Sequence, residues 1–428
     1  MSILDRILDT DSPALVRHCK LESTGGPTLP VAPAVYAGTT LEQRYRLCER
    51  APIFDLDDDG FMYHDTGRTG RSVVISSVAA EATRAESAIY QDPEMSKWLP
   101  GIEVLAPSGE LLDSVVKAVL HARKNDLKTL DASEVGAELK QILANWRTSS
   151  WETAHRHVDA VIRYSIDPET GRQAIATPGS DLYRQLVSSD PAAIVRLSLN
   201  SLIWGYWLAS GAAVTHRRAR SISTHITGFD AEPVYVHATK AAGALPASSN
   251  SKLSLESGEL VMASKGKKPS AFGLGSVISA ESTSPVHFVC GAIAQQTSVA
   301  LTDFRALKRQ GIAPDLVRAC LGVAIIATEQ AANDLHLRSE CDLMEVSVPV
   351  WGVRRRGERK SQPLDVALGE VREATLAALQ RAVKEGHLPA DQQGQLRKTT
   401  LCLSGPLAQV TLEARLEALT KGDKGASE

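Results

Sequence analysis

The sequence lacks long apolar runs and has few aromatic residues. Phe, Trp and Tyr make up 5% of its 428 residues. No stretch approaches the roughly 20 consecutive apolar residues that a membrane-spanning helix requires. The opening segment MSILDRILDTDSPALVRHCK carries acidic residues early and lacks the basic-then-apolar pattern of a secretory signal. These absences argue against a membrane or exported protein, and we expect a cytoplasmic location.

Paired cysteines are also absent. The six cysteines lie far apart and form no C-x-x-C pair, so neither a zinc site nor a disulfide framework is indicated. No Gly-x-Ser-x-Gly element and no cysteine–histidine constellation is present, and GLGS (273–276) lacks the strand–helix context of a phosphate-binding loop. We therefore expect no metal and no cofactor, and we find no credible catalytic site.

Two acidic or histidine patterns could hold a metal but are better explained otherwise. DLDDDG (55–60) resembles the opening of a calcium loop, but the position of the bidentate Glu is occupied by Thr66 or Arg68, depending on the starting Asp. His155 and Asp159 are four residues apart on a predicted helix. Such pairs are usually exposed helix surface, and no third ligand stands at a suggestive spacing.

The formal charge is segregated along the chain although the net charge is only −3 at pH 7. Basic residues gather in THRRAR (215–220), SKGKK (264–268) and WGVRRRGERK (351–360), and acidic residues gather in FDLDDDGFMYHD (54–65). The net charge argues against a free-standing nucleic-acid binder, which usually has a basic excess. The segregation nevertheless allows a basic groove on a mildly acidic body.

Strand and helix patterns alternate along the chain, which predicts an α+β fold. RSVVISSV (71–78) reads as a strand that runs directly into a helix over 79–90, and SKLSLESGELVMAS (251–264) reads as a hairpin. Further helices are predicted over 111–124, 132–146, 151–164, 188–210, 313–334 and 365–386, and further strands over 286–301 and 343–356. We expect one elaborated domain over 1–419 and a disordered tail over 420–428.

The basic segments are the candidate binding sites. Guanidinium groups close together suit phosphate, and small residues (210–213) before the arginines would let a ligand approach the backbone; the alternative is a solvated loop. The Gly-rich lysine segment could close over a nucleic-acid backbone, or it is a mobile surface loop. WGVRRRGERK reads as a protected sheet edge, with Trp351 as a possible stacking face.

Four segments resemble a known family. NSLIWGYWLASGAAVTHRRARSISTHITGFDA (200–231), VVISSVAAEATRAE (73–86), LRSECDL (337–343) and LESTGGPTLPVAPAVYAGT (21–39) occur in family order. Together they resemble the signature of the RAMP backbone subunit of type I-U, or I-G, CRISPR effector complexes. At the strand–helix junction Ser76 and Thr83 replace the family's Asp and Asn, so the chain resembles a divergent member.

This resemblance implies a non-catalytic subunit whose copies polymerise along a CRISPR guide RNA. It implies an RNA-recognition-motif-like (ferredoxin-like) palm, with a helical insertion near 95–165 and a thumb-like hairpin near 232–286. Implied partners are the guide RNA, target DNA through that guide, further copies of the chain and other subunits of the surveillance complex. By motif match, the implied RNA-lining residues are Ser77, Arg84, Arg220 and Arg338. Local charge adds Arg217, Arg218, Lys265, Lys267 and Lys268.

Two other functions remain open from the sequence. Related RAMP proteins include endoribonucleases that cleave guide precursor or target RNA, and the candidates here would be His216, His225 or the DLDDDG loop. A general base must lie within hydrogen-bond reach of the proton that it removes, and no second partner residue is evident. A metabolic protein with an anion site at HRRAR fits the local chemistry but not the four ordered segments.

Overall fold

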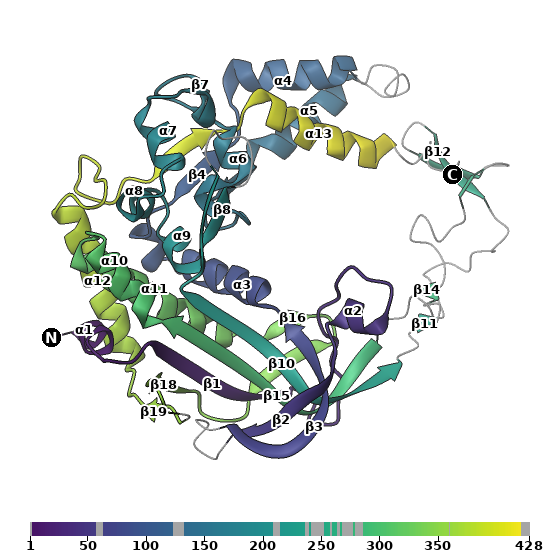
Figure 1. Cartoon of the computed structure of the whole chain (residues 1–428). Coiled ribbons are helices and arrows are strands. Elements are labelled where there is room, and N and C mark those ends of the chain that lie inside the picture. The colour runs from purple at the N-terminus through teal and green to yellow at the C-terminus, as the bar shows by residue number, and fades with distance from the viewer. Residues whose placement is uncertain are drawn as a thin grey trace.

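The computed structural model describes residues 2–56, 63–122, 132–208, 215–235, 239–240, 252–256, 259–262, 266–267, 277–278, 286–358 and 360–420. In these residues thirteen α-helices and several β-sheets form a mixed α and β protein (Figure 1), which confirms that both element types are present. A search of the same residues finds no helix with the length and apolarity to span a bilayer.

The largest sheet has nine strands, and every neighbouring pair is antiparallel. Its order is β16-β17-β1-β15-β10-β3-β2, with β18 paired to β1 and β19 paired to β18. The strands are β1 (Ala14–Ser23), β2 (Cys48–Leu56), β3 (Tyr63–Ser76), β10 (Ile222–Tyr235), β15 (Val286–Ala300), β16 (His336–Arg338), β17 (Cys341–Glu345), β18 (Val350–Arg354) and β19 (Gln362–Pro363).

Two helices cover one face of this sheet (Figure 1). α3 (Val78–Gln91) follows β3 directly, because the Ser77 side chain accepts the Ala80 N–H and caps the first turn. α11 (Pro314–Ala332) begins with a proline, whose fixed φ suits the first helical position. Both helices contribute to the main apolar core beneath the sheet, and α12 (Leu368–Lys384) packs on the outer side of α11.

A second unit is built mostly from residues between α3 and β10, together with a C-terminal strand and helix. Its sheet has the order β5-β4-β20-β6-β7, and α4 (Gly109–Ala122), α5 (Ala132–Ala144) and α13 (Gly405–Thr420) enclose a separate apolar core. The described residues within 95–165 therefore hold three α-helices, α4, α5 and α6 (Ala160–Arg163), together with strands, and the C-terminal part completes the unit with β20 and α13. The strands are β4 (Ile102–Leu105), β5 (Arg147–Ser149), β6 (Ile166–Asp167), β7 (Arg172–Gln173) and β20 (Thr399–Cys402).

Three sequence predictions of single elements are wrong. The helix predicted over 151–164 is a 3-10 turn followed by the four-residue α6 (Ala160–Arg163). The helix predicted over 188–210 begins only at Pro191, is divided into α8 (Pro191–Leu197) and α9 (Leu199–Trp204), and ends before Gly205, whose φ is +75°. The strand predicted over 343–356 is two strands, β17 and β18.

Part of the predicted hairpin region is described. β12 (Leu253–Glu256) pairs with β13 (Glu259–Met262), which confirms the strand pair predicted within 251–264. The remainder of the expected thumb contributes only short described pieces, and residues 421–428 of the predicted tail lie outside the described residues, as do Lys265 and Lys268.

Candidate nucleic-acid interface

Two of the three basic segments lie at one end of the large sheet. The strand register aligns the start of β10, the end of β15, the start of β1 and the end of β18. The segment before β10 and the segment after β18 therefore share a sheet end. Because neighbouring strands are about 4.8 Å apart, β10 and β18 are separated by about 14 Å. We call residues 215–220, Arg305 and Arg354–Arg356 the basic end.

A short two-stranded ribbon forms the first part of the basic end. β8 (Tyr206–Leu208) pairs with β9 (His216–Arg218), so that Trp207 lies directly opposite Arg217. Side chains alternate between the two faces of a strand. Tyr206 and Leu208 are buried, whereas Trp207 is 58% exposed and Arg217 is exposed. The outer face of the ribbon therefore presents an indole ring beside a guanidinium group.

The inner face of the ribbon is fixed to the protein. Arg218 Nη2 donates to Asp303 Oδ2 at 2.7 Å, and Asp303 belongs to the first turn of α10 (Leu301–Arg309). Ser221 Oγ bonds the same carboxylate oxygen. The guanidinium of Arg218 is thus committed to a mostly buried ion pair, and it anchors the ribbon rather than facing solvent.

Arg220 lies beside another cation. The Arg156 guanidinium holds the buried Glu86 carboxylate in two bonds of 2.8 and 2.7 Å and donates to the Gly205 carbonyl. Burial and the nearby Arg156 lower the pKa of Arg220, and the Glu86 carboxylate offsets part of this effect. Among the described residues, neither Arg217 nor Arg220 has an ion pair. Both are free to meet an added anion.

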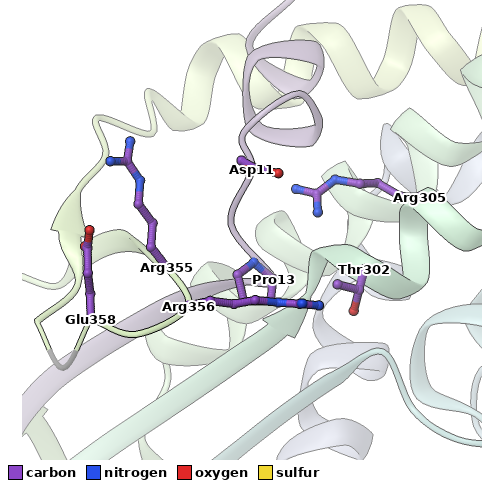
Figure 2. Close-up of a pocket in the computed structure, with 7 residues that line it drawn as sticks. All are labelled: Asp11, Pro13, Thr302, Arg305, Arg355, Arg356 and Glu358. Atoms are coloured by element: carbon purple, nitrogen blue, oxygen red, sulfur yellow. The ribbon is translucent and has the colours of Figure 1, made fainter.

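A pocket of about 520 Å³ forms the second part of the basic end (Figure 2). Arg305 is held by the carbonyls of Leu8 and Ser12, each at 2.8 Å, and by that of Thr10. Arg355 and Arg356 are exposed and have no ion pair among the described residues. The arrangement suits an oxyanion, although two carboxylates also line it. The complete lining is Asp11, Pro13, Thr302, Arg305, Arg355, Arg356 and Glu358.

Of the four residues implied by motif match, only Arg220 belongs to the basic end. The other three, Ser77, Arg84 and Arg338, lie elsewhere and already have partners. Ser77 caps α3. Arg84 donates to Glu81 at 2.7 Å, to the Ala331 carbonyl at 2.6 Å and to the Asp334 carbonyl. It thereby joins α3 to the end of α11.

Arg338 is similarly committed. It donates to the Ala32 carbonyl at 2.8 Å. Burial raises the pKa of the Cys341 thiol to about 11, and the charges of Arg338 and Arg84 oppose that shift. Arg84 and Arg338 therefore both have partners outside the basic end.

Lys267 is the one described member of the lysine segment. Its backbone exchanges two hydrogen bonds of 2.9 Å with Leu253, so it adds a bridge beside the β12–β13 hairpin.

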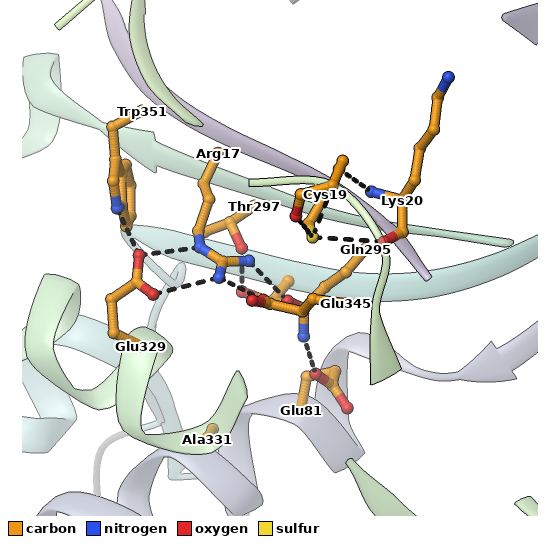
Figure 3. A network of polar contacts seen from close by, with 12 residues as sticks. Arg17, Cys19, Lys20, Glu81, Gln295, Thr297, Glu329, Ala331, Glu345 and Trp351 are labelled. Carbon is orange, nitrogen blue, oxygen red and sulfur yellow. Dashed lines mark hydrogen bonds and ion pairs between the residues drawn. The ribbon is translucent and has the colours of Figure 1, made fainter. Parts of the chain in front are cut away.

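Trp351 is not a stacking face, contrary to the sequence prediction. It is only 5% exposed, and its Nε1 donates to Glu329 Oε1 at 2.5 Å (Figure 3). The exposed indole is Trp207, which was not predicted because residues 188–210 have the pattern of a single helix. The signal was the alternation in the segment YWL directly after Gly205.

The two histidines considered for catalysis are held in their neutral forms. His216 shares a hydrogen bond of 3.1 Å with the Tyr206 hydroxyl, and burial lowers the pKa of His216. Burial also lowers the pKa of His225, more than Gln296 and Glu81 raise it. The described residues contain no group of three or more metal-ligating side chains, and residues 57–60 of the acidic loop lie outside them.

Comparison with protein families identifies the chain. The model of the family described as CRISPR-associated protein GSU0053 matches residues 15–233, just over half of the sequence. The chain belongs to this family. This confirms the family resemblance, and three of the four resembling segments lie within the match.

Comparison with solved structures finds a chain described as "CRISPR RNA-guided surveillance complex, pre-nicking". The two chains are 9% identical with a TM-score of 0.32, and the alignment covers 94% of this chain and 99% of that one. A similarity this low carries no argument about function. A comparison with curated proteins finds no match.

Proposed function

We propose that this CRISPR-associated protein is a non-catalytic backbone subunit of a type I-U, or I-G, surveillance complex. It binds guide RNA largely independently of sequence, and further copies bind along the same RNA. The guide is thereby presented to other subunits and to invading DNA, which is recognised by base pairing.

The path of the chain through the sheet supports an RNA-recognition-motif-like palm. The strands and helices follow the sequence β1, α3, β10, β15, α11, β17, and the four strands stand in the sheet order β17-β1-β15-β10. This order matches the alternation of two βαβ halves expected of a ferredoxin-like fold. The β2–β3 hairpin and the second unit are then insertions into that palm.

The observation that carries the proposal is the basic end. Exposed arginines without partners among the described residues are gathered there from distant parts of the chain, in a protein of a CRISPR-associated family. Guanidinium groups bind phosphate bidentately and carry no sequence preference by themselves, which is what a guide with a variable spacer requires. We therefore assign RNA contact first to Arg217 and Arg220, ahead of the committed Ser77, Arg84, Arg218 and Arg338.

A salt titration tests this assignment. The full chain is titrated with single-stranded RNA in magnesium at several salt concentrations, and the RNA is inspected for cleavage. Arg217→Ala with Arg220→Ala should reduce the slope of log affinity against log salt by about 1.4, because each lost phosphate contact on a single strand accounts for about 0.7.

The matched control removes the same charge elsewhere. Arg172→Ala with Arg397→Ala changes two exposed arginines of the second unit and should leave the slope unaltered. Equal slopes for the two double variants would refute the assignment. Cleavage of the RNA would favour the endoribonuclease instead, with His216→Ala as the first variant to examine.

A further inference from the structure

Trp207 is unusual among the six tryptophans of the chain, all of which are described. Three are buried and two are half-buried, whereas Trp207 is 58% exposed. Single exposed apolar residues are common on protein surfaces and need no explanation by themselves. The position of Arg217 supplies the second observation.

The indole and the guanidinium form a fixed pair. Trp207 and Arg217 are direct cross-strand partners on the outer face of the ribbon, and such partners have Cβ atoms about 5 Å apart. The inner face is held by Arg218 on Asp303 and by Tyr206, whose ring meets the His157 ring edge-to-face at 4.7 Å. The ribbon therefore presents both groups from a rigid base.

The charge of the ribbon selects the chemistry of its ligand. Its described residues, 206–208 and 215–220, contain three arginines and no carboxylate. A flat π-face with an adjacent cation matches a nucleobase and its phosphate, because bases of every type stack on aromatic rings while guanidinium binds the phosphate. A protein partner would need an acidic group beside an apolar one, and that remains an outcome of the test below.

We propose that an unpaired nucleobase of the bound RNA stacks on Trp207 while Arg217 binds the adjoining phosphate. This rests on the proposed RNA-binding function and adds a base-contacting site to it. The contact is tolerant of base identity, since stacking uses the face of the base and not its hydrogen-bonding edge.

An oligonucleotide without bases separates the two contributions. The full chain is titrated with a single-stranded RNA of about ten nucleotides, a length within the range that single-strand-binding sites accommodate, and with an abasic oligonucleotide of equal length and charge. Trp207→Ala should weaken binding to the RNA about 5- to 150-fold, the value of one stacked base, and should leave binding to the abasic strand unchanged. Arg217→Ala should weaken both.

Two controls establish that stacking is what is lost. Trp207→Phe should restore most of the affinity for RNA, because a phenyl ring also stacks. Tryptophan fluorescence of the wild-type chain should be quenched by RNA but not by the abasic strand, and Trp207→Phe should lose that quenching.

Each outcome decides the matter. Wild-type binding to RNA that Trp207→Ala does not change would overturn the stacking site and leave the proposed function standing. Equal losses on RNA and abasic strand would also overturn it, in favour of a general disturbance of the ribbon. Absence of any wild-type RNA binding would overturn both proposals, and would turn attention to a protein surface as the partner of Trp207.

Discussion

The substitution Arg17→Met tests whether a buried ion network holds the large sheet to its helices. Arg17 is fully buried in β1 and donates to Glu329 of α11 at 2.8 and 3.1 Å, to Glu345 at 2.7 Å and to Gln295 at 2.8 Å (Figure 3). Burial lowers the pKa of Arg17, but the two carboxylates outweigh it and raise the pKa overall. The guanidinium is therefore charged in the folded protein.

The expected cost comes from the carboxylates that lose their cation. Methionine replaces most of the hydrocarbon volume of the arginine, so the cavity contributes little. Breaking a buried pair on one side costs about 3–5 kcal/mol. The side chains of Glu329 and Glu345 remain 14% and 27% exposed, so water solvates them in part. We therefore expect a loss near the lower limit, about 3 kcal/mol.

Chemical denaturation measures this loss, and its pH dependence identifies the cause. A carboxylate without its cation in a buried site has a folded-state pKa above the unfolded value of about 4.3, so folding takes up protons. The deficit of Arg17→Met should therefore shrink as the pH falls from neutral to about 5. Adding Glu329→Gln should recover about half of the loss at neutral pH, because one uncompensated charge is removed.

An exposed ion pair provides the control. Arg6 and Glu370 form a pair at 3.4 Å, with side chains 60% and 62% exposed. Arg6→Met should cost less than about 1 kcal/mol, as exposed pairs do. If Arg17→Met costs no more than Arg6→Met, or if its deficit does not depend on pH, the reasoning about the buried network is refuted.

Three further substitutions probe other parts of the fold. Gly322→Ala in α11 places a Cβ against Thr375 Oγ1 of α12 and should cost about 1–3 kcal/mol in denaturation, with partial recovery on adding Thr375→Ala. Burial, with smaller contributions from nearby cations, lowers the pKa of His157 to about 3. The unfolded state therefore takes up the proton first, and the free energy of unfolding falls as the pH drops below about 6.5. His157→Gln should remove about 2 kcal/mol of this pH-dependent loss of stability at pH 5. Gly205→Ala should lower both the free energy of unfolding and the affinity for RNA, because φ is +75° and the added Cβ would meet the Arg218 carbonyl oxygen. An unchanged affinity for RNA would show that RNA does not bind the ribbon.

Capping serines and prolines in the sequence indicate where some helices begin. The strand predicted over 71–78 ends at Ser76 and the helix begins at Val78, because the intervening serine caps it. Pro191 stands at the first position of α8, where the fixed φ of proline suits a helix. These features need only the backbone and side chains within one turn, so a single sequence contains enough information to place them.

Exposure of the tryptophans could not be predicted in the same way. In β18, Trp351 is buried because it belongs to the main apolar core, which is built from elements distant in the sequence, and its indole N–H bonds Glu329 of α11. The network around Arg17 has the same origin, since its partners are 278 to 328 residues distant in the sequence. Pattern and spacing carry no information about such contacts.

Arginines that are adjacent in the sequence can differ in whether they face solvent or already have a partner. A cluster of positive charge in the sequence therefore predicts more ligand-binding residues than the structure offers. Arg217 and Arg218 are neighbours, yet strand alternation turns one outward and the other onto Asp303. Arg84, which matches the family motif, likewise donates its guanidinium hydrogen bonds to Glu81 and to two carbonyl groups. A family signature therefore includes residues that build the fold, whereas the exposed arginines of the basic end have no ion pair among the described residues.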